Sequence, residues 1–425
     1  MNNFKEEEVM KKRAIAVLMA TVMSMGMTAC GGGKDSEKDS KNADGKIEID
    51  FYEHSDAEPY IQDLVDAYEK QNPNVKVNLT IIANDDYDDK LKVMLAGGSD
   101  VDCFWVRGGT QARTMADKGA LLDLTDLCEE NHVDTSVYGE AQKAYEIDGK
   151  TYGLSTTKTA WMLFYNKDLF DKAGLPYPTA MTWDEYTELT KSLTTENLKG
   201  GLVPNWSLNL GSAAGGEVLT DEKLERTRAW IEYLNKWYVE DKSHYGMEEM
   251  TGSFDVNGTF AEGNTYTMIN GDWTFGLLDN SNPEFEWDCA PMPTFEGDDG
   301  STAGTTSVYS INAKCSDEEA KAAFDLMKFI CYSDEGAKIY AEHSFVPAYP
   351  SEEAEQIYLD ANTKEGADYV FSANVRPEAG TEVYYDEIGT AFKEEMTLAL
   401  VGDCTINEAF ENFKTRREDI VASYK

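Results

Sequence analysis

The residues best suited to binding a small solute lie together in residues 257–273, which read NGTFAEGNTYTMINGDW. The FAEG portion is typical of a short helix that ends at a glycine, residues 265–269 alternate like a strand, and a turn follows. Such a turn would present Trp273 and Asp272 at a strand end, where open α/β sheets bind their ligands. A flat apolar ring beside a carboxylate suits a partly apolar, hydroxylated ligand such as a sugar. The alternative is that Trp273 packs beneath a loop.

Catalytic and metal-binding constellations are not evident in the chain. The four histidines are scattered, no two cysteines have the C-x-x-C spacing of zinc sites, and no Ser/His/Asp arrangement is recognisable. We therefore expect no catalytic residue, no metal and no cofactor. Cys103 and Cys331 fall within apolar strand and helix patterns and are expected to be buried free thiols. Whether other cysteines form disulfides stays open.

A β-α-β-α-β order near the start of the chain predicts the element that would position further candidates. Strand patterns over residues 47–52, 75–82 and 101–106 alternate with helical patterns over 61–68 and 91–95. This order predicts an α/β lobe with a largely parallel sheet.

Polar and aromatic side chains follow these strands. Asp56 comes after the first strand, and Trp105 and Arg107 lie at the end of the third. Because the carboxyl ends of parallel strands meet at one edge of the sheet, we expect these three side chains to face a common ligand.

The second half of the chain predicts another lobe and a route back to the first. Residues 161–165 read as a strand, and capping boxes at 182–185 and 316–319 predict helix starts. The loop over 200–218 is rich in Gly, Asn and Ser, and its Trp206 could reach a cleft. Residues 344–348 are expected to cross back to the other lobe.

Length and charge narrow the possible functions. The 425 residues are 41% hydrophobic, which is enough for two lobes of ordinary domain size. With 79 acidic against 38 basic residues, the formal charge is −41, so nucleic acid and anionic membrane surfaces would repel the protein. We interpret the acidic charge as a means of keeping the protein soluble outside the cell, in preference to an acidic surface that binds a partner. We also expect the protein to be a monomer.

The N-terminus predicts export. Residues 11–13 are basic and precede an apolar run over 14–29, which is too short to span a membrane but typical of a signal peptide. The run ends before Cys30 in a pattern that resembles a bacterial lipobox, so we expect cleavage after residue 29, a lipid on Cys30 and a flexible linker over 30–45. Acidic residues 6–8 suggest that translation starts at Met10.

From about residue 47 to the end, the chain resembles extracellular solute-binding proteins of the maltose-binding type. The matching segments occur in the family's order at 68–73, 102–105, 147–150, 164–169, 182–185, 257–273 and 347–348. The resemblance implies an α/β, periplasmic-binding-protein-like fold of type 2, with two hinge-linked lobes that close on a solute. The implied lobes are 46–157 with 307–346, and 158–306 with 347–425.

The resemblance also implies site residues and partners. Trp105, Trp273 and Tyr385, or Tyr384 in an alternative register, fall near the family's ring positions beside the bound sugar. The family passes its solute to the permease subunits of an ATP-binding-cassette (ABC) transporter, which places this chain on the outer face of the bacterial cytoplasmic membrane.

Two departures argue for an oligosaccharide other than maltose. The chain has Val106-Arg107 where the maltose binders have an Asp-Arg pair, and Thr159 where they carry a Glu. The full set of candidate ligand contacts is Trp273, Trp105, Asp272, Tyr385, Trp206, Arg107, Asp56 and Arg376.

Three other functions remain open at this point. A polyamine could use the same rings and carboxylates through cation–π contacts and ion pairs. A surface-anchored glycosidase would need only two suitably spaced carboxylates. A tethered sensor that presents its ligand to a receptor would have the same sequence features as a transport protein.

Overall fold

The structure is a computed structural model that describes residues 45–251 and 254–425. The predicted signal peptide, 1–29, and the predicted lipid attachment site, Cys30, lie outside these residues, as does all but residue 45 of the predicted linker. Within the described ranges, no helix combines the length and the apolar character needed to cross a bilayer.

The buried apolar side chains form two clusters, each around its own sheet. We call the lobe around the five-stranded sheet the N-lobe, and the lobe around the three-stranded sheet the C-lobe. Helix α13 (Asp334–Glu342) contributes to both, since Tyr340 belongs to the N-lobe cluster and Ala341 to the C-lobe cluster.

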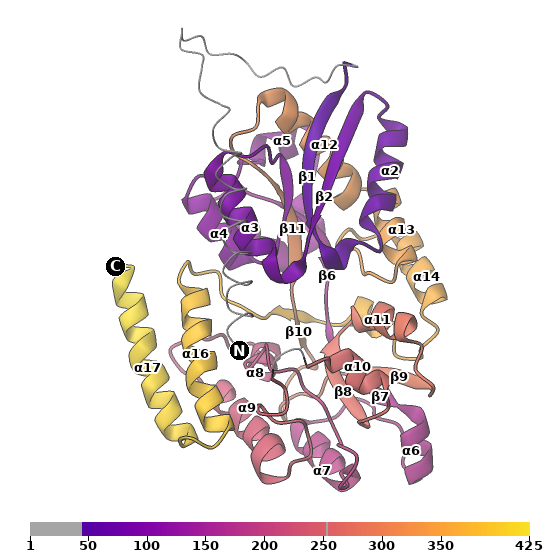
Figure 1. Cartoon of the computed structure of the whole chain (residues 1–425), viewed down its shortest axis with the longest axis vertical. Helices are drawn as coiled ribbons and strands as arrows, with labels where there is room; N and C mark the ends of the chain where they lie inside the picture. Colours follow the sequence, from indigo (N-terminus) through magenta and orange to yellow (C-terminus); the bar gives the residue numbers. More distant parts are fainter. Residues whose placement is uncertain (1–44, 252–253) are drawn as a thin grey trace, which may run out of the picture. The chain divides into compact units, whose positions relative to one another are not determined.

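The N-lobe sheet has the strand order β2-β1-β3-β11-β6. Strand β1 is parallel to β2 and β3, whereas β11 is antiparallel to β3 and β6. In Figure 1 the orange β11 and α12 complete a lobe that is otherwise indigo to purple. Residues from after position 300 are therefore part of the lobe that contains the first strands of the chain. The strands are β1 (Ile47–His54), β2 (Val75–Ile82), β3 (Cys103–Val106), β6 (Leu154–Lys158) and β11 (Thr306–Ile311).

The N-lobe helices cover this sheet with apolar faces. Helix α2 buries Ile61, Leu64, Val65 and Tyr68, a spacing that lies on one helix face. A capping box of Ser316 and Glu319 starts α12, as predicted. The helices are α2 (Ile61–Gln71), α3 (Asn84–Gly97), α4 (Gly109–Asp117), α5 (Thr125–Glu130) and α12 (Asp317–Cys331); the 3-10 turns are η1 (Ser55–Ala57), η2 (Thr135–Tyr138) and η3 (Glu140–Tyr145); and β4 (Glu146–Ile147) pairs with β5 (Lys150–Thr151) as a hairpin.

The C-lobe is built on β7, which is buried along its whole length between two antiparallel neighbours, β8 and β9. The indoles of Trp183, Trp230 and Trp237 pack together in the core, with ring centres 4.8 to 5.8 Å apart. The strands are β7 (Trp161–Asn166), β8 (Thr267–Gly271), β9 (Trp287–Pro291), β10 (Thr302–Gly304) and β12 (Val375–Pro377), and β10 pairs with β12 in parallel.

Further helices complete the C-lobe, and the capping box of Thr182 and Glu185 starts α7 as predicted. The helices are α6 (Lys167–Ala173), α7 (Trp183–Leu193), α8 (Leu210–Ala214), α9 (Glu225–Asn235), the π-helical turn η4 (Lys236–Glu240), α10 (Val256–Ala261), α11 (Thr274–Ser281), α14 (Glu352–Ala361), α15 (Tyr369–Ser372), α16 (Tyr385–Leu400) and α17 (Ile406–Ser423).

Three segments that connect the lobes run side by side and are hydrogen-bonded to one another. The backbone N–H of Thr159 donates to Thr305 O at 3.0 Å, and that of Lys158 donates to Val346 O at 3.0 Å. Gly304 is required here, because a Cβ at this position would lie 2.0 Å from Thr159 O. We call these paired segments the hinge.

Candidate ligand-binding site

A cavity of about 1080 Å³ is lined by residues of both lobes. Small-molecule sites usually measure roughly 300 to 1,000 Å³, so this cleft has room for a ligand larger than one sugar unit. Its wall includes Arg107, Gly109, Thr110, Gln111 and Tyr145 from the N-lobe and Trp161, Trp206, Trp273 and Glu378 from the C-lobe.

The N-lobe wall is formed around the start of α4. Gly109 allows this helix to pack closely, because a Cβ there would lie 2.7 Å from the Cβ of Ala144. The next residue, Thr110, donates from Oγ1 to Gly380 O of the C-lobe at 3.0 Å. The two lobes are therefore in direct contact at one side of the cleft.

Arg107 is held in place at this wall by an ion pair. Its Nε lies 3.2 Å from Asp88 Oδ2, and its Nη2 donates to Asn84 Oδ1 at 2.7 Å. Gln111 also donates to Asp88, at 3.0 Å. A guanidinium fixed in this way can donate to a ligand with little loss of side-chain entropy.

The C-lobe wall contains Trp273, which is the N-cap residue of α11 and lies two residues after the end of β8. Gly271 makes this placement possible, because a Cβ there would lie 1.9 Å from the Trp273 ring. The half-buried indole packs edge-to-face on Trp161, with ring centres 5.4 Å apart. Since β8 is antiparallel to β7, the position of Trp273 depends on this turn and not on the end of a parallel strand.

Glu378 is a lining residue that the sequence did not single out. Its Oε1 accepts a hydrogen bond from Trp161 Nε1 at 2.6 Å, and its backbone oxygen accepts one from Asn209 Nδ2 at 3.0 Å. Burial raises the pKa of Glu378, while the Trp161 hydrogen bond lowers it. Trp161 is only 1% exposed, yet it also lines the cleft.

The charges around the cleft are nearly balanced. The lining has three acidic residues, Asp88, Glu378 and Asp386, and four basic ones, Lys92, Arg107, Lys118 and Lys314. The protein as a whole has a strong acidic excess. The cleft therefore does not share the charge of the surface and has no acidic excess that would select a polycation.

Of the eight candidate contacts, Trp273, Trp206 and Arg107 come together in the lining of the cleft. Trp105 does not, because it is 8% exposed and lies beneath Arg107, whose guanidinium carbon is 4.8 Å from the ring centre. His54 packs on the same indole at 4.1 Å. Trp105 thus supports Arg107 from below.

The other candidates also lie outside this lining. Asp56 is exposed and accepts a hydrogen bond from Asn84 at 2.7 Å. Arg376 uses its guanidinium within the C-lobe, where it pairs with Asp299 and donates to Ala214 O, each at 2.9 Å. Tyr385 is buried and lines a smaller neighbouring cavity.

Asp272 is buried behind Trp273, in contact with the hinge. Its Oδ1 accepts a hydrogen bond from the backbone N–H of Ala160 at 3.0 Å. Burial raises the pKa of Asp272 to about 7, although the hydrogen bond from Ala160 and the nearby charge of Lys158 lower it. Its position suits a structural role between β8 and the hinge.

Metal and thiol chemistry have no visible centre in the part of the chain that the structure describes. In these residues, no group of three or more His, Cys, Asp and Glu side chains could hold a metal ion. Cys103 and Cys331 are buried free thiols, as predicted. The other described cysteines are Cys128, Cys289, Cys315 and Cys404, and they are free as well.

A two-lobed fold with a large cleft between the lobes is the geometry of a protein that closes on a solute. Residues 63–365 match the family model for bacterial extracellular solute-binding proteins. The chain belongs to this family. The prediction made from the order of short motifs is therefore confirmed.

Curated relatives of this solute-binding protein cover most of its length. An arabinooligosaccharide-binding protein of Bacillus subtilis (strain 168) is 26% identical over 356 residues, which are 77% of this chain and 78% of the relative. A galactooligosaccharide-binding protein of the same strain is 24% identical over 364 residues, 80% of this chain and 82% of the relative.

Solved structures share the fold of this solute-binding protein. An ABC substrate-binding protein from Listeria monocytogenes in complex with cycloalternan aligns with a TM-score of 0.78 and 27% identity, covering 89% of this chain and 98% of that chain. Maltose-bound MalE3 of T. maritima aligns with a TM-score of 0.72 and 20% identity, covering 88% and 99%. The predicted two-lobed, periplasmic-binding-protein-like α/β fold is confirmed.

Proposed function

We propose that this solute-binding protein captures an oligosaccharide between its lobes and delivers it to the permease of an ABC transporter. The observation that carries the proposal is the cleft of about 1080 Å³ lined by Trp161, Trp206 and Trp273 together with Glu378 and Arg107. The C–H faces of a pyranose stack on indoles, and its hydroxyls suit carboxylate and guanidinium partners. The ligands named for the arabinooligosaccharide and galactooligosaccharide relatives support the same ligand class.

The near balance of acidic and basic lining residues favours a neutral ligand over a polyamine. A polyamine site would gain most from an excess of carboxylates, as the Coulomb term is largest for unpaired charges in a partly dry cleft. An uncharged sugar needs donors and acceptors of both kinds, which this lining offers.

The proposal includes the setting of the protein. It acts outside the cell as a monomer, held to the outer face of the cytoplasmic membrane by a lipid on Cys30, and binds its ligand without chemical change. The lobes comprise 46–157 with 307–346, and 158–306 with 347–425. Among the residues named from the sequence, Trp273, Trp206 and Arg107 are the proposed ligand contacts, and Trp105 supports Arg107 from behind.

Thermal unfolding of residues 34–425 against a panel of mono- and oligosaccharides, with spermidine as the control, tests the proposal. A ligand at about 100 times its Kd adds about 2.7 kcal/mol to the free energy of unfolding, which raises Tm measurably. We expect one oligosaccharide class to raise Tm and to be recovered intact. A shift with spermidine alone would contradict the sugar, and recovery of shortened sugars would indicate a glycosidase.

A further inference from the structure

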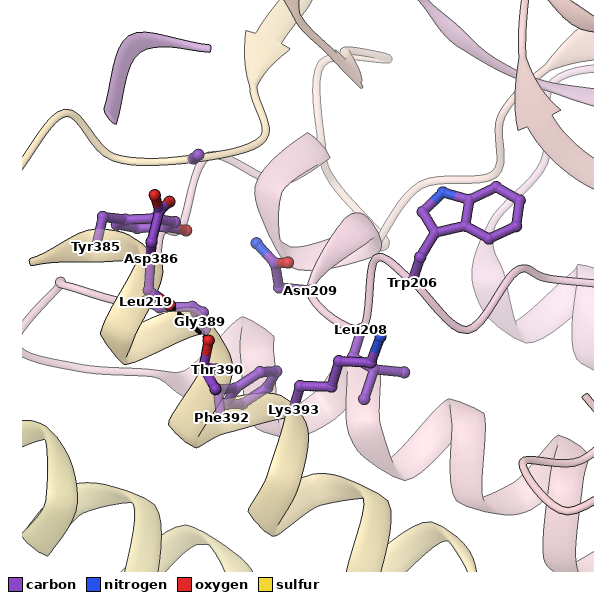
Figure 2. A pocket seen from close by; sticks show the side chains of 11 residues that line it. Trp206, Leu208, Asn209, Leu219, Tyr385, Asp386, Gly389, Thr390, Phe392 and Lys393 are labelled. Carbon is purple, nitrogen blue, oxygen red and sulfur yellow. Dashed lines mark hydrogen bonds between the residues drawn. The ribbon is translucent and has the colours of Figure 1, made fainter. Parts of the chain in front are cut away.

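A second cavity of about 360 Å³ adjoins the cleft and lies against α16. The two cavities share Trp206, Ala379 and Asp386 in their linings, so they meet at these residues. In the view of Figure 2, Asn209 lies between the indole of Trp206 and the side chains of Tyr385 and Asp386, and Lys393 extends toward Leu208. We call this second cavity the α16 pocket.

The indole at the junction is not explained by packing. Trp206 is 48% exposed, whereas the core indoles of Trp183, Trp230 and Trp237 are fully buried. Among the aromatic residues that the structure describes, Trp206 takes part in none of the ring pairs seen elsewhere. An exposed indole at the junction of two cavities offers an apolar face on which a sugar ring can stack.

The floor of the α16 pocket contains a glycine that neither the backbone nor the packing requires. Gly389 lies inside α16, where glycine is the least favourable residue after proline. It is not among the glycines with positive φ, and no atom lies within 4 Å of the place where its Cβ would be. A side chain at this position would occupy the open space of the pocket, so the glycine keeps that space free.

The side chains around Gly389 suit a sugar. Asp386, Thr390 and Lys393 are exposed on α16, and Asn209, the residue just before α8, faces them across the pocket. Phe392, Leu208 and Leu219 supply apolar surface among these donors and acceptors. The volume is at the lower end of the range for small-molecule sites.

We infer that the bound oligosaccharide extends from the cleft across Trp206 into the α16 pocket, so that the pocket selects for chain length. This inference rests on the proposed function and adds a site to it. The cleft binds the inner sugar units, Trp206 stacks on the unit that crosses the junction, and the α16 pocket holds a terminal unit. Ligands too short to cross Trp206 gain nothing from the pocket.

The test compares chain-length preference in the protein and in the Gly389→Trp variant. Isothermal titration calorimetry uses malto-, galacto-, arabino- and manno-oligosaccharides of two to six units. We expect the longest sugars of the bound class to lose affinity by at least about tenfold in the variant, which is the loss expected for one ring contact and its hydrogen bonds. The shortest bound sugar should change by less than about twofold.

Two further variants keep the outcome interpretable. Leu398→Trp adds an indole to a 41% exposed position of the same helix outside both cavities, and it should leave the length preference unchanged. Gly389→Gln places a smaller side chain in the pocket and serves if the Gly389→Trp variant does not fold.

The results separate this inference from the proposed function. If oligosaccharides bind and the two Gly389 variants keep the length preference of the unmodified protein, the α16 pocket is not a sugar site, although the proposed function stands. An equal loss for short and long sugars also overturns the inference. Failure of the unmodified protein to bind any of the oligosaccharides overturns both.

Discussion

Asp272 and Ala160 are joined by two hydrogen bonds that link the end of β8 to the hinge. Asp272 Oδ1 accepts from the backbone N–H of Ala160 at 3.0 Å, and the backbone N–H of Asp272 donates to Ala160 O, also at 3.0 Å. Trp273, the next residue, lines the cleft. A movement of the hinge at residue 160 is therefore transmitted directly to an indole of the site.

The buried carboxyl of Asp272 should make stability fall with pH. Its pKa is about 7 in the folded protein, against 3.8 for an ordinary Asp, so the protonated form favours folding. This contribution is complete below about pH 4 and is lost as the pH rises toward 7. Asp272→Asn has no charge to lose and keeps the acceptor, so its free energy of unfolding should decline less between pH 4.5 and 7.5 in urea denaturation.

Asp272→Ala is the matched comparison, since it leaves the Ala160 N–H without its side-chain acceptor. Relative to Asp272→Asn, which does not titrate either, we expect a loss of about 1 to 3 kcal/mol at both pH values. Equal slopes of stability with pH in the unmodified protein and the Asn variant would show that Asp272 is charged in the folded state.

Removal of the Trp273 ring should weaken ligand binding by at least about tenfold, or about 1.4 kcal/mol. The same change removes the edge contact with Trp161, and the free energy of unfolding should fall by about 1 kcal/mol. Calorimetry and thermal unfolding of Trp273→Ala measure the two effects. Trp273→Phe keeps an aromatic face and should lose less affinity; an unchanged affinity in the Ala variant would assign the ring to the core.

Glu378→Gln tests the carboxylate beside Trp161. Glutamine still accepts the indole hydrogen bond, so Tm should change little, whereas a hydroxyl bound to a neutral acceptor gains less than one bound to a charged acceptor. We expect affinity to fall by about fivefold, equivalent to about 1 kcal/mol. Glu387→Gln, on the exposed side of α16, is the control. Equal affinity in the two variants would remove Glu378 from the site.

The hinge segments are so close together at Gly304 that a single added methyl group should lower the stability of the protein. Gly304→Ala would place a Cβ 2.0 Å from Thr159 O, so the segments must separate, at a cost of about 1 to 3 kcal/mol. Gly97→Ala has open space around its Cβ near the end of α3 and should be neutral or slightly stabilising. Chemical denaturation compares the two, and equal stability would show that the hinge yields without cost.

Local patterns in the sequence predicted the elements that local physics determines. The β-α-β-α-β order became β1, α2, β2, α3 and β3, because apolar periodicity reports which face of an element is buried. The capping boxes at Thr182 and Ser316 are formed, since both partners lie within one helical turn. The predicted strand over 265–269 is displaced to Thr267–Gly271, a shift of two residues at its boundary.

The site depends on contacts between distant residues, which explains why it was harder to predict. Glu378 meets Trp161 across 217 positions of the chain, and no local motif marks either residue for this contact. Trp105 lies near the end of β3, as predicted, but its ring is buried because it packs against His54 and beneath Arg107. Type and spacing identify a ring near a cleft, while its orientation depends on the packing of neighbouring elements.

The place of β11 in the N-lobe sheet has a consequence for how the protein matures. Strands β3 and β6 become neighbours of β11 only after residues 306–311 have been made, whereas the three strands of the C-lobe sheet all lie within residues 161–291. The N-lobe is thus synthesised first, but its sheet is completed only when β11 has been made. Until then, β3 and β6 are strands with an unpaired edge. A fragment that stops at the end of β6 would expose those edges. We expect this fragment to aggregate during biosynthesis, under conditions in which the complete chain folds.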